Sequence, residues 1–344
     1  MYIKRIVILY VFIIILLINS VVYAAPYQRR FKVGVSIQSL GGIIRDAYEG
    51  VVEIIYILPE GAEPHSYQVT PDVIQSLGDV DIFVFTGHFS FEYKILESYP
   101  NKPHITLDIE DKTYNGYKVH LLKYPSGEGY NPHGYWLYPD NAYLIAKAFR
   151  DILVELDPSN IEYYNRLLNE FKMRIEELKD LYREVSIKYN LNSSLILIGF
   201  PAEEYIVEPF NASIVGVIVK GPGQIITPEE TNKIVSILSK SPNKYIISSD
   251  IASKMGVFKL LNDISRMSES KVIYVNVVGA GFDSYIELMY FNLGMIVGGI
   301  ESNPYILSDG SGGGLNIILL TFVVLLIIVV IVEAVYIYLL SRVY

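Results

Sequence analysis

The sequence predicts an α/β fold of two lobes, each a mostly parallel four-stranded sheet with helices on both faces, joined by one long interdomain helix. Two stretches of the chain alternate apolar, strand-like segments with amphipathic helical segments, which is typical of parallel sheets covered by helices. A helix-periodic segment from Pro158 to Tyr189 separates these two stretches. The part between the apolar ends, about 280 residues, has the usual size of two domains.

The interdomain helix is predicted from apolar residues that recur three and four positions apart, which places them on one helix face. Asp157 is the predicted N-cap, and Pro158 the predicted first helical residue. A helix of this length spans roughly 48 Å, so we interpret it as a strut between two lobes, with a coiled-coil dimer helix as the alternative. The predicted buried face comprises Ile161, Tyr164, Leu168, Phe171, Ile175, Leu178, Tyr182, Val185 and Tyr189.

The two ends of the chain predict export. Lys4 and Arg5 precede an apolar run, and Ala24 closes a small-residue cleavage pattern, so residues 1–24 are a predicted signal peptide, with an uncleaved anchor as the alternative. Residues 301–316 form a predicted glycine-rich tether and residues 317–340 a predicted transmembrane helix. We therefore expect a cell-surface protein on the extracellular side, anchored by this C-terminal transmembrane helix.

Between these ends, the predicted division is an N-terminal α/β lobe at 25–156, a linking helix at 157–190 and a C-terminal α/β lobe at 191–300. In the first lobe, strands are predicted at 31–36, 51–58, 81–86 and 105–107, and its last helix at Pro139–Leu156. In the second lobe, strands are predicted at 195–198, 214–219, 245–248 and 272–275.

Composition excludes several classes of partner and site. The formal net charge of −9 argues against nucleic acid, because there is no basic surface to neutralise phosphates. The chain has no cysteine, which excludes disulfides, thiolate metal sites and cysteine nucleophiles. Neither a zinc-protease motif nor a serine nucleophile elbow occurs.

Three histidines lie just beyond predicted strands or just before a helix. His65 follows the second strand, His88 follows the third, and His133 precedes the helix that starts at Pro139. In open parallel sheets, ligands bind at the carboxyl ends of the strands. Three imidazoles that converge there suit zinc or another borderline divalent ion. His104 and His120 are interpreted as ordinary residues, although His120 is also a candidate for capturing the metal early.

Several motifs carry a family resemblance. They are the run Leu58-Pro59-Glu60-Gly61-Ala62-Glu63-Pro64-His65-Ser66-Tyr67, the triplet Asn131-Pro132-His133, Trp136-Leu137 and Gly221-Pro222-Gly223-Gln224. Their order over most of residues 32–300 resembles the zinc- and manganese-binding solute-binding proteins of ABC importers. The resemblance implies a receptor, not an enzyme, that captures a divalent metal ion, zinc or manganese, in an interlobe cleft and delivers it to an ABC permease.

The resemblance also implies a metal site with two ligands from each lobe. His65 and His133 match the two histidines that the family takes from its first lobe. The third ligand of the family, His or Glu, falls on Phe200, and the fourth, an acid, falls on Asn276. Phenylalanine cannot bind a metal, and a neutral amide is a poor ligand for zinc, so the full family site does not carry over.

Other residues are therefore expected to complete the site. We expect His88 to replace the third ligand and Asp283 to supply the acid, so that the predicted metal ligands are His65, His88, His133 and Asp283. Glu203 and Glu204 are alternative acids, although acids at the start of a helix more often interact with the helix dipole.

Three other functions stay open on the sequence. One is a receptor for a chelated metal or another small molecule. A second is a metallohydrolase, for which Glu63 or Glu203 would be the general base. A third is an adhesin or structural surface protein. The expected partners are a divalent metal ion and an ABC permease, with no nucleic acid, and the protein is expected to be a monomer.

Overall fold

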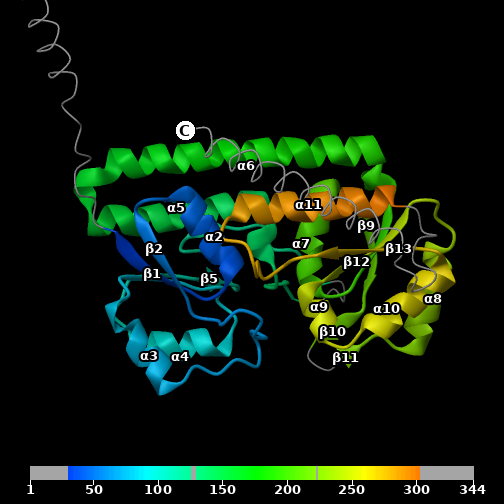
Figure 1. Ribbon diagram of the computed structural model, residues 1–344, viewed down its shortest axis with the longest axis horizontal. Coiled ribbons are helices and arrows are strands. Elements are labelled where there is room, and N and C mark those ends of the chain that lie inside the picture. The colour runs from blue at the N-terminus through cyan, green and yellow to red at the C-terminus, as the bar shows by residue number, and fades with distance from the viewer. Residues whose placement is uncertain (1–29, 125–128, 222–223, 303–344) are drawn as a thin grey trace, which may run out of the picture. The chain divides into compact units, whose positions relative to one another are not determined.

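The computed structural model describes residues 30–124, 129–221 and 224–302 (Figure 1). Contacts divide the chain into two compact units, Met1–Ile300 and Glu301–Tyr344, and the elements described below lie in the first, apart from Glu301 at the end of the last helix. The predicted signal peptide at 1–24 and the predicted span at 317–340 lie outside the described residues. The predicted boundaries of the two lobes and of the linking helix at 157–190 stay predictions. The names N-terminal lobe and C-terminal lobe here denote the parts of the chain around each large sheet.

The N-terminal lobe contains four parallel strands in the order β2-β1-β3-β4. Every residue of β3 is fully buried, as expected for a parallel sheet covered on both faces. Figure 1 shows α2 and α5 on one side of this sheet, with α3 and α4 on the other. The strands are β1 (Phe31–Val35), β2 (Val52–Tyr56), β3 (Ile82–Val84) and β4 (His104–Ile105), and the helices are α2 (Gln38–Ala47), α3 (Pro71–Ser76), α4 (Ser90–Ser98) and α5 (Pro139–Leu156).

The stretch between β4 and α5, for which the sequence analysis predicts no helix or strand, contains several short elements. A small antiparallel sheet, in the order β5-β6-β7, lies there, and a 3₁₀ turn at Tyr135–Leu137 leads into α5. Its strands are β5 (Leu107–Asp108), β6 (Thr113–Tyr114) and β7 (Tyr117–Lys118). Strands this short carry no clear periodic pattern, which is why the sequence does not reveal them.

The C-terminal lobe repeats the plan with four parallel strands in the order β13-β12-β8-β9. A hairpin of β10 and β11 follows β9. A capping box opens the helix that follows Thr227, because the Thr227 hydroxyl and the Glu230 carboxylate each accept the other's backbone N–H. The elements are β8 (Leu195–Ile198), β9 (Ser213–Val217), β10 (Val219–Gly221), β11 (Gln224–Ile225), β12 (Lys244–Ser249), β13 (Lys271–Val275), α7 (Glu204–Val207), α8 (Pro228–Leu238), α9 (Asp250–Lys254), α10 (Phe258–Ser268) and α11 (Tyr285–Glu301).

The long helix is α6 (Ile161–Tyr189), and it is preceded by a 3₁₀ turn at Pro158–Asn160. Of the predicted buried face, Ile161 is an exception, since it is 41% exposed, and Tyr189 is only half-buried. The predicted N-cap is also wrong in detail. Asp157 precedes the 3₁₀ turn rather than α6 itself, and its carboxylate accepts hydrogen bonds from the side chains of Ser159 and Asn160 in that turn and of Tyr164 in the first turn of α6.

Helix α6 contacts both lobes. Toward its middle, the guanidinium of Arg174 donates to the backbone carbonyl of Asp46 in α2. Near its end, the Ser186 hydroxyl donates to the backbone carbonyl of Phe210 at 3.0 Å, and the rings of Tyr182 and Phe210 lie 4.9 Å apart. Because one continuous helix is fixed to both lobes, their relative movement requires that these contacts rearrange.

The buried face of α6 can be tested with a charge. Leu168 is only 4% exposed, and an unpaired carboxylate there is costly, so we expect Leu168→Asp to lower the free energy of unfolding by roughly 3 kcal/mol or more. Glu170→Ala is the matched control on the exposed face, with an expected change of about 0.5 kcal/mol or less. Urea unfolding followed by circular dichroism measures both, and equal tolerance of the two changes would show that this face is not buried.

Candidate metal site

Three imidazoles meet at the carboxyl ends of the N-terminal strands. His65 lies in the loop after β2, His88 in the turn after β3, and His133 just ahead of the 3₁₀ turn that leads into α5. One ring nitrogen of each lies within 4.8 Å of the others, and within the described part of the chain these three side chains are the group that can hold a metal ion. We call them the histidine group.

A buried carboxylate shapes the turn that carries His88. Glu92 is 1% exposed, and its oxygens accept the backbone N–H groups of Thr86, Gly87, His88 and Phe89 at 2.7 to 3.2 Å. Gly87 has a φ of +85°, in the left-handed region that favours glycine. The position of the His88 ring is therefore set by this turn, and neither of its buried nitrogens makes a hydrogen bond of ordinary geometry.

The turn that carries His65 is held in a similar way. The two Glu63 carboxylate oxygens accept the backbone N–H groups of His65 at 3.0 Å and of Ser66 at 2.7 Å. Burial raises the pKa of Glu63, but these hydrogen bonds outweigh it and leave the pKa below its usual value. Glu63 therefore stays ionised beside the histidine group.

An amide orients the third ring. The Asn131 side-chain oxygen lies 3.2 Å from Nδ1 of His133 and accepts the His133 backbone N–H at 3.0 Å. The Tyr124 hydroxyl lies 3.1 Å from the same Nδ1. A proton assigned to Nδ1 by this network leaves Nε2 with the lone pair that a metal needs.

The C-terminal lobe fixes that amide. The Asn131 side-chain nitrogen donates to the Glu204 carboxylate at 2.7 Å and to the Pro201 carbonyl at 2.9 Å. Asn131 is fully buried and Glu204 is 5% exposed. Burial raises the pKa of Glu204 to about 7. The second lobe thus supports a metal-binding side chain through a residue of the first, an arrangement that commonly tunes metal affinity.

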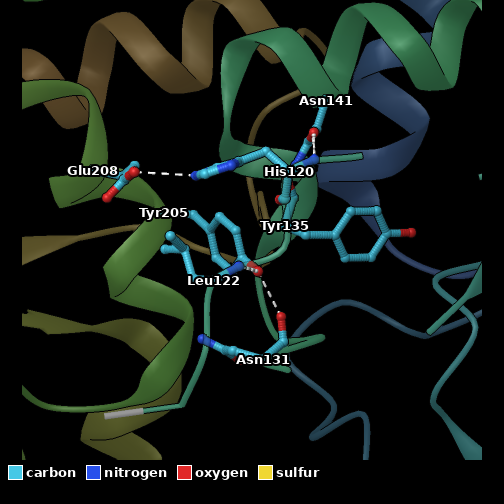
Figure 2. A network of polar contacts seen from close by, with 7 residues as sticks. All are labelled: His120, Leu122, Asn131, Tyr135, Asn141, Tyr205 and Glu208. Atoms are coloured by element: carbon cyan, nitrogen blue, oxygen red, sulfur yellow. Dashed lines mark hydrogen bonds and ion pairs between the residues drawn. The ribbon is translucent and has the colours of Figure 1, made fainter. Parts of the chain in front are cut away.

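Further contacts between the lobes surround this amide (Figure 2). The Tyr205 hydroxyl donates to the Asn131 carbonyl at 2.6 Å and accepts the Leu122 N–H at 3.0 Å. His120 pairs with Glu208 at 3.1 Å. His120 is therefore an interlobe contact here and not a member of the histidine group.

The electrostatics keep all three rings neutral. Burial lowers the pKa of His65, and it lowers the pKa of His133 to about 3. The pKa of His88 lies well below its usual value because of burial and the neighbouring imidazoles. Neutral imidazole is the form that binds a metal, so the metal-free protein is ready for binding at neutral pH.

The cavity at the histidine group is small and has an apolar roof. Its volume is about 20 Å³. The edge of the Phe200 ring faces His133, with centroids 5.2 Å apart at 78°, so Phe200 lies at the site but contributes no ligand. The residues that the C-terminal lobe contributes to the lining are Phe200, Ala202, Ile251, Val277 and Val278.

The expected acidic ligand is not part of the group. The Asp283 carboxylate lies 3.5 Å from the Arg45 guanidinium and accepts a hydrogen bond from Tyr56, because the opposite charge attracts it there. The Glu203 carboxylate accepts the N–H groups of Gly199 and Phe200 at the start of its own helical turn, and burial raises its pKa to about 8.

Asn276 also serves the local structure. Its side-chain oxygen accepts the Gly279 N–H at 2.8 Å, and its amide nitrogen donates to the Ala280 carbonyl.

Sequence reasoning missed the roles of Glu92 and Asn131. Two features of the sequence could have pointed to these roles. Glu92 is an acid in the first turn of a helix that follows a strand, and Asn131 is an asparagine two residues before a candidate ligand.

The comparisons with known proteins agree on one family. The family model described as zinc-uptake complex component A, periplasmic, matches residues 33–299. The manganese-binding lipoprotein MntA of Halalkalibacterium halodurans is 24% identical over 275 residues, covering 78% of this chain and 88% of that protein. The manganese ABC transporter substrate-binding lipoprotein PsaA of Streptococcus pneumoniae is 22% identical over 285 residues, covering 79% and 90%.

Solved structures support the fold. The SBP FpvC of Pseudomonas aeruginosa in complex with Mn²⁺ has a TM-score of 0.62 at 22% identity, covering 79% of this chain and 98% of that one. A crystal structure of ZnuA has a TM-score of 0.62 at 18% identity, covering 77% and 98%. These likenesses, with the sheets described above, confirm the predicted fold class.

The relatives correct the predicted localisation. MntA and PsaA are named lipoproteins, and a lipoprotein is held at a membrane by a lipid rather than by a C-terminal transmembrane helix. This contradicts the predicted anchor. In the described ranges, no helix is long and apolar enough to cross a membrane.

The role of Asn131 can be tested against a matched residue. Asn131→Ala removes the partner of Nδ1 in His133, and loss of such a partner typically lowers metal affinity 10- to 100-fold. Asn141→Ala is the control, because Asn141 is also fully buried and bonds to the backbone of His120 and Tyr135. Isothermal titration with zinc should show the loss in the first variant alone. Equal losses in both would indicate a general structural effect.

Proposed function

Because the chain belongs to the family of periplasmic zinc-uptake components, we propose that it is the substrate-binding receptor of an ABC importer. It captures a divalent metal ion at the histidine group and delivers it to an ABC permease. The observation that carries the proposal is the cluster of ring nitrogens from His65, His88 and His133 within 4.8 Å of one another, in a cavity that apolar residues of the other lobe help to line.

The donor set favours zinc over manganese. Imidazole nitrogens suit zinc, whereas manganese prefers carboxylate, carbonyl and water oxygens. The histidine group includes no carboxylate, and Asp283 is engaged by Arg45. Zinc also binds a given nitrogen site more tightly than manganese does. Zinc is therefore the proposed cargo, although several relatives are named for manganese.

The size of the cavity argues against a chelated metal. Sites for small organic ligands usually enclose roughly 300 Å³ or more, whereas this cavity measures about 20 Å³. A metallohydrolase would need a general base near the ion. Glu63 is held by two backbone N–H groups and Glu203 caps its own turn, so we propose binding without catalysis.

Binding and release need only small movements. In a tetrahedral site with Zn–N bonds of about 2.0–2.1 Å, ligand nitrogens lie roughly 3.4 Å apart. The ring nitrogens lie within 4.8 Å of one another, so they need to approach by at most about 1.4 Å. Release requires that the contacts of the C-terminal lobe with Asn131 loosen, because they hold His133 in its binding orientation.

The histidine group can be tested one residue at a time. We expect His65→Ala, His88→Ala and His133→Ala each to lower zinc affinity at least 100-fold, since two remaining protein ligands hold zinc poorly. His104→Ala is the control, because the His104 ring bonds to a local carbonyl and lies outside the group. Isothermal titration with zinc and with manganese measures both effects. Tight zinc binding by the His88→Ala variant, or tighter binding of manganese than of zinc by the wild type, would contradict the proposal.

The lowered pKa values of the three histidines predict that zinc binding tolerates mildly acidic pH. An ordinary imidazole takes up a proton near pH 6.5, but in this protein burial lowers the pKa of all three rings, that of His133 to about 3. We therefore expect nearly equal zinc affinity at pH 7.5 and 6.5, with losses only at lower pH. Below about pH 6.5 the unfolded chain binds more protons than the folded one, so these histidines should also lower the stability of the metal-free protein as the pH falls. Titrations at pH 7.5, 6.5 and 5.5 test this, and a steep loss of affinity that begins above pH 6.5 would contradict it.

A further inference from the structure

Two tripeptides of the chain have the form that N-glycosylation requires, an asparagine followed two residues later by serine or threonine. They are Asn192-Ser193-Ser194 and Asn211-Ala212-Ser213. Both lie in the C-terminal lobe, the first directly before β8 and the second at the start of β9. Transfer of a glycan needs access to the asparagine amide and to the hydroxyl of the third residue, so the folded structure can distinguish the two.

The tripeptide at Asn192 is closed in the folded chain. Its Ser194 is fully buried, and the Ser194 hydroxyl donates to the Asn190 carbonyl at 3.4 Å. The backbone before it forms a 3₁₀ turn at Leu191–Ser193. Asn192 itself is exposed, but the hydroxyl that completes the motif is not accessible.

The tripeptide at Asn211 is open. Asn211 and Ser213 are both exposed, and neither side chain makes a hydrogen bond to another residue in the described ranges. The Ser213 backbone N–H donates to the Ser194 carbonyl at 3.0 Å, which fixes the tripeptide at the start of β9. Asn211 has a φ of +54°, a conformation that asparagine adopts readily. This turn alone therefore does not identify a modification site.

A second observation concerns the strand that this tripeptide begins. Strand β9 lies at the edge of the C-terminal sheet, where its outer side pairs with no described strand. It has no charged residue and no proline, the residues with which edge strands usually resist pairing with another chain. Ile214 and Val215 are only partly buried. The register with β8 shifts between Ile196 and Leu197, but such a bulge disrupts pairing only locally.

We propose that Asn211, and not Asn192, carries an N-linked glycan, which covers the unpaired edge of β9. This inference rests on the location outside the cytoplasm that the proposed function implies, and not on the histidine group. The co-substrate is a lipid-linked oligosaccharide activated by phosphate. The amide nitrogen of Asn211 forms a bond to the anomeric carbon, and the bond from that carbon to the phosphate oxygen breaks. The lipid phosphate leaves with the electron pair, and the amide gives up one proton.

A glycan at this position leaves the metal site open. Asn211 precedes the amino end of β9, whereas the lining residue Phe200 follows the carboxyl end of β8. Because β8 and β9 run parallel, the glycan and the apolar roof of the cavity lie at opposite ends of these strands. The bulky hydrophilic chain thus shields the sheet edge without entering the cavity.

The test uses the full chain purified from the cells that naturally produce it. A protease that cleaves after glutamate separates the two asparagines, because Glu203 and Glu204 lie between them. Mass spectrometry of the peptides should find sugar residues on Asn211 and an unmodified Asn192. Unmodified Asn211, or a glycan on Asn192, would overturn the inference.

Three variants produced in the same cells separate modification from folding. Ser213→Ala should abolish the glycan, whereas Ser213→Thr should keep it, since threonine also completes the motif. Asn192→Gln should leave the mass of the glycan unchanged. All three should bind zinc as the wild type does, and weak zinc binding by the wild type would count against the proposed function alone.

Light scattering during heating tests the role of the glycan at the edge. The Ser213→Ala variant should aggregate at a lower temperature than the Ser213→Thr variant, because its β9 edge is uncovered. Equal aggregation of the two would contradict this role.

Discussion

The convergence of three neutral imidazoles on one small cavity is the constraint on which the rest of the site depends. Two buried nitrogens of His88 lack hydrogen bonds of ordinary geometry, which is unfavourable in the metal-free protein. Such a cost persists only where surrounding structure enforces it, and here Glu92 fixes the turn that carries His88. A metal ion would give one of these nitrogens a partner that the described protein groups do not supply.

The two lobes have different roles in this arrangement. The N-terminal lobe supplies the histidine group, and the C-terminal lobe supplies an apolar roof and a hydrogen bond to the amide of Asn131. The lobes are also joined at α11, where Asp46 accepts hydrogen bonds from the Ser284 hydroxyl and the Ile286 N–H at 2.9 Å. With α6 fixed to both lobes, any relative movement of the lobes must rearrange these polar contacts.

Much of the fold follows from local patterns, and the site follows only in part. Helix α5 begins and ends where the sequence predicts, because Pro139 suits the first helical position. The histidine group could be anticipated because the carboxyl ends of parallel strands meet at one edge of a sheet. The position of Asp283 could not, because its pairing with Arg45 depends on how α2 packs against the start of α11. The role of Asn131 was hidden for the same reason, since its partner Glu204 belongs to the other lobe.

The central claim is that three imidazoles, without a protein carboxylate, hold the ion. X-ray absorption spectroscopy of the zinc-loaded protein tests it most directly, because the outer-shell scattering of imidazole rings counts histidine ligands. The account predicts three imidazole nitrogens at about 2.0–2.1 Å. A shell of two imidazoles completed by carboxylate oxygens, or one made mainly of oxygen, would contradict it.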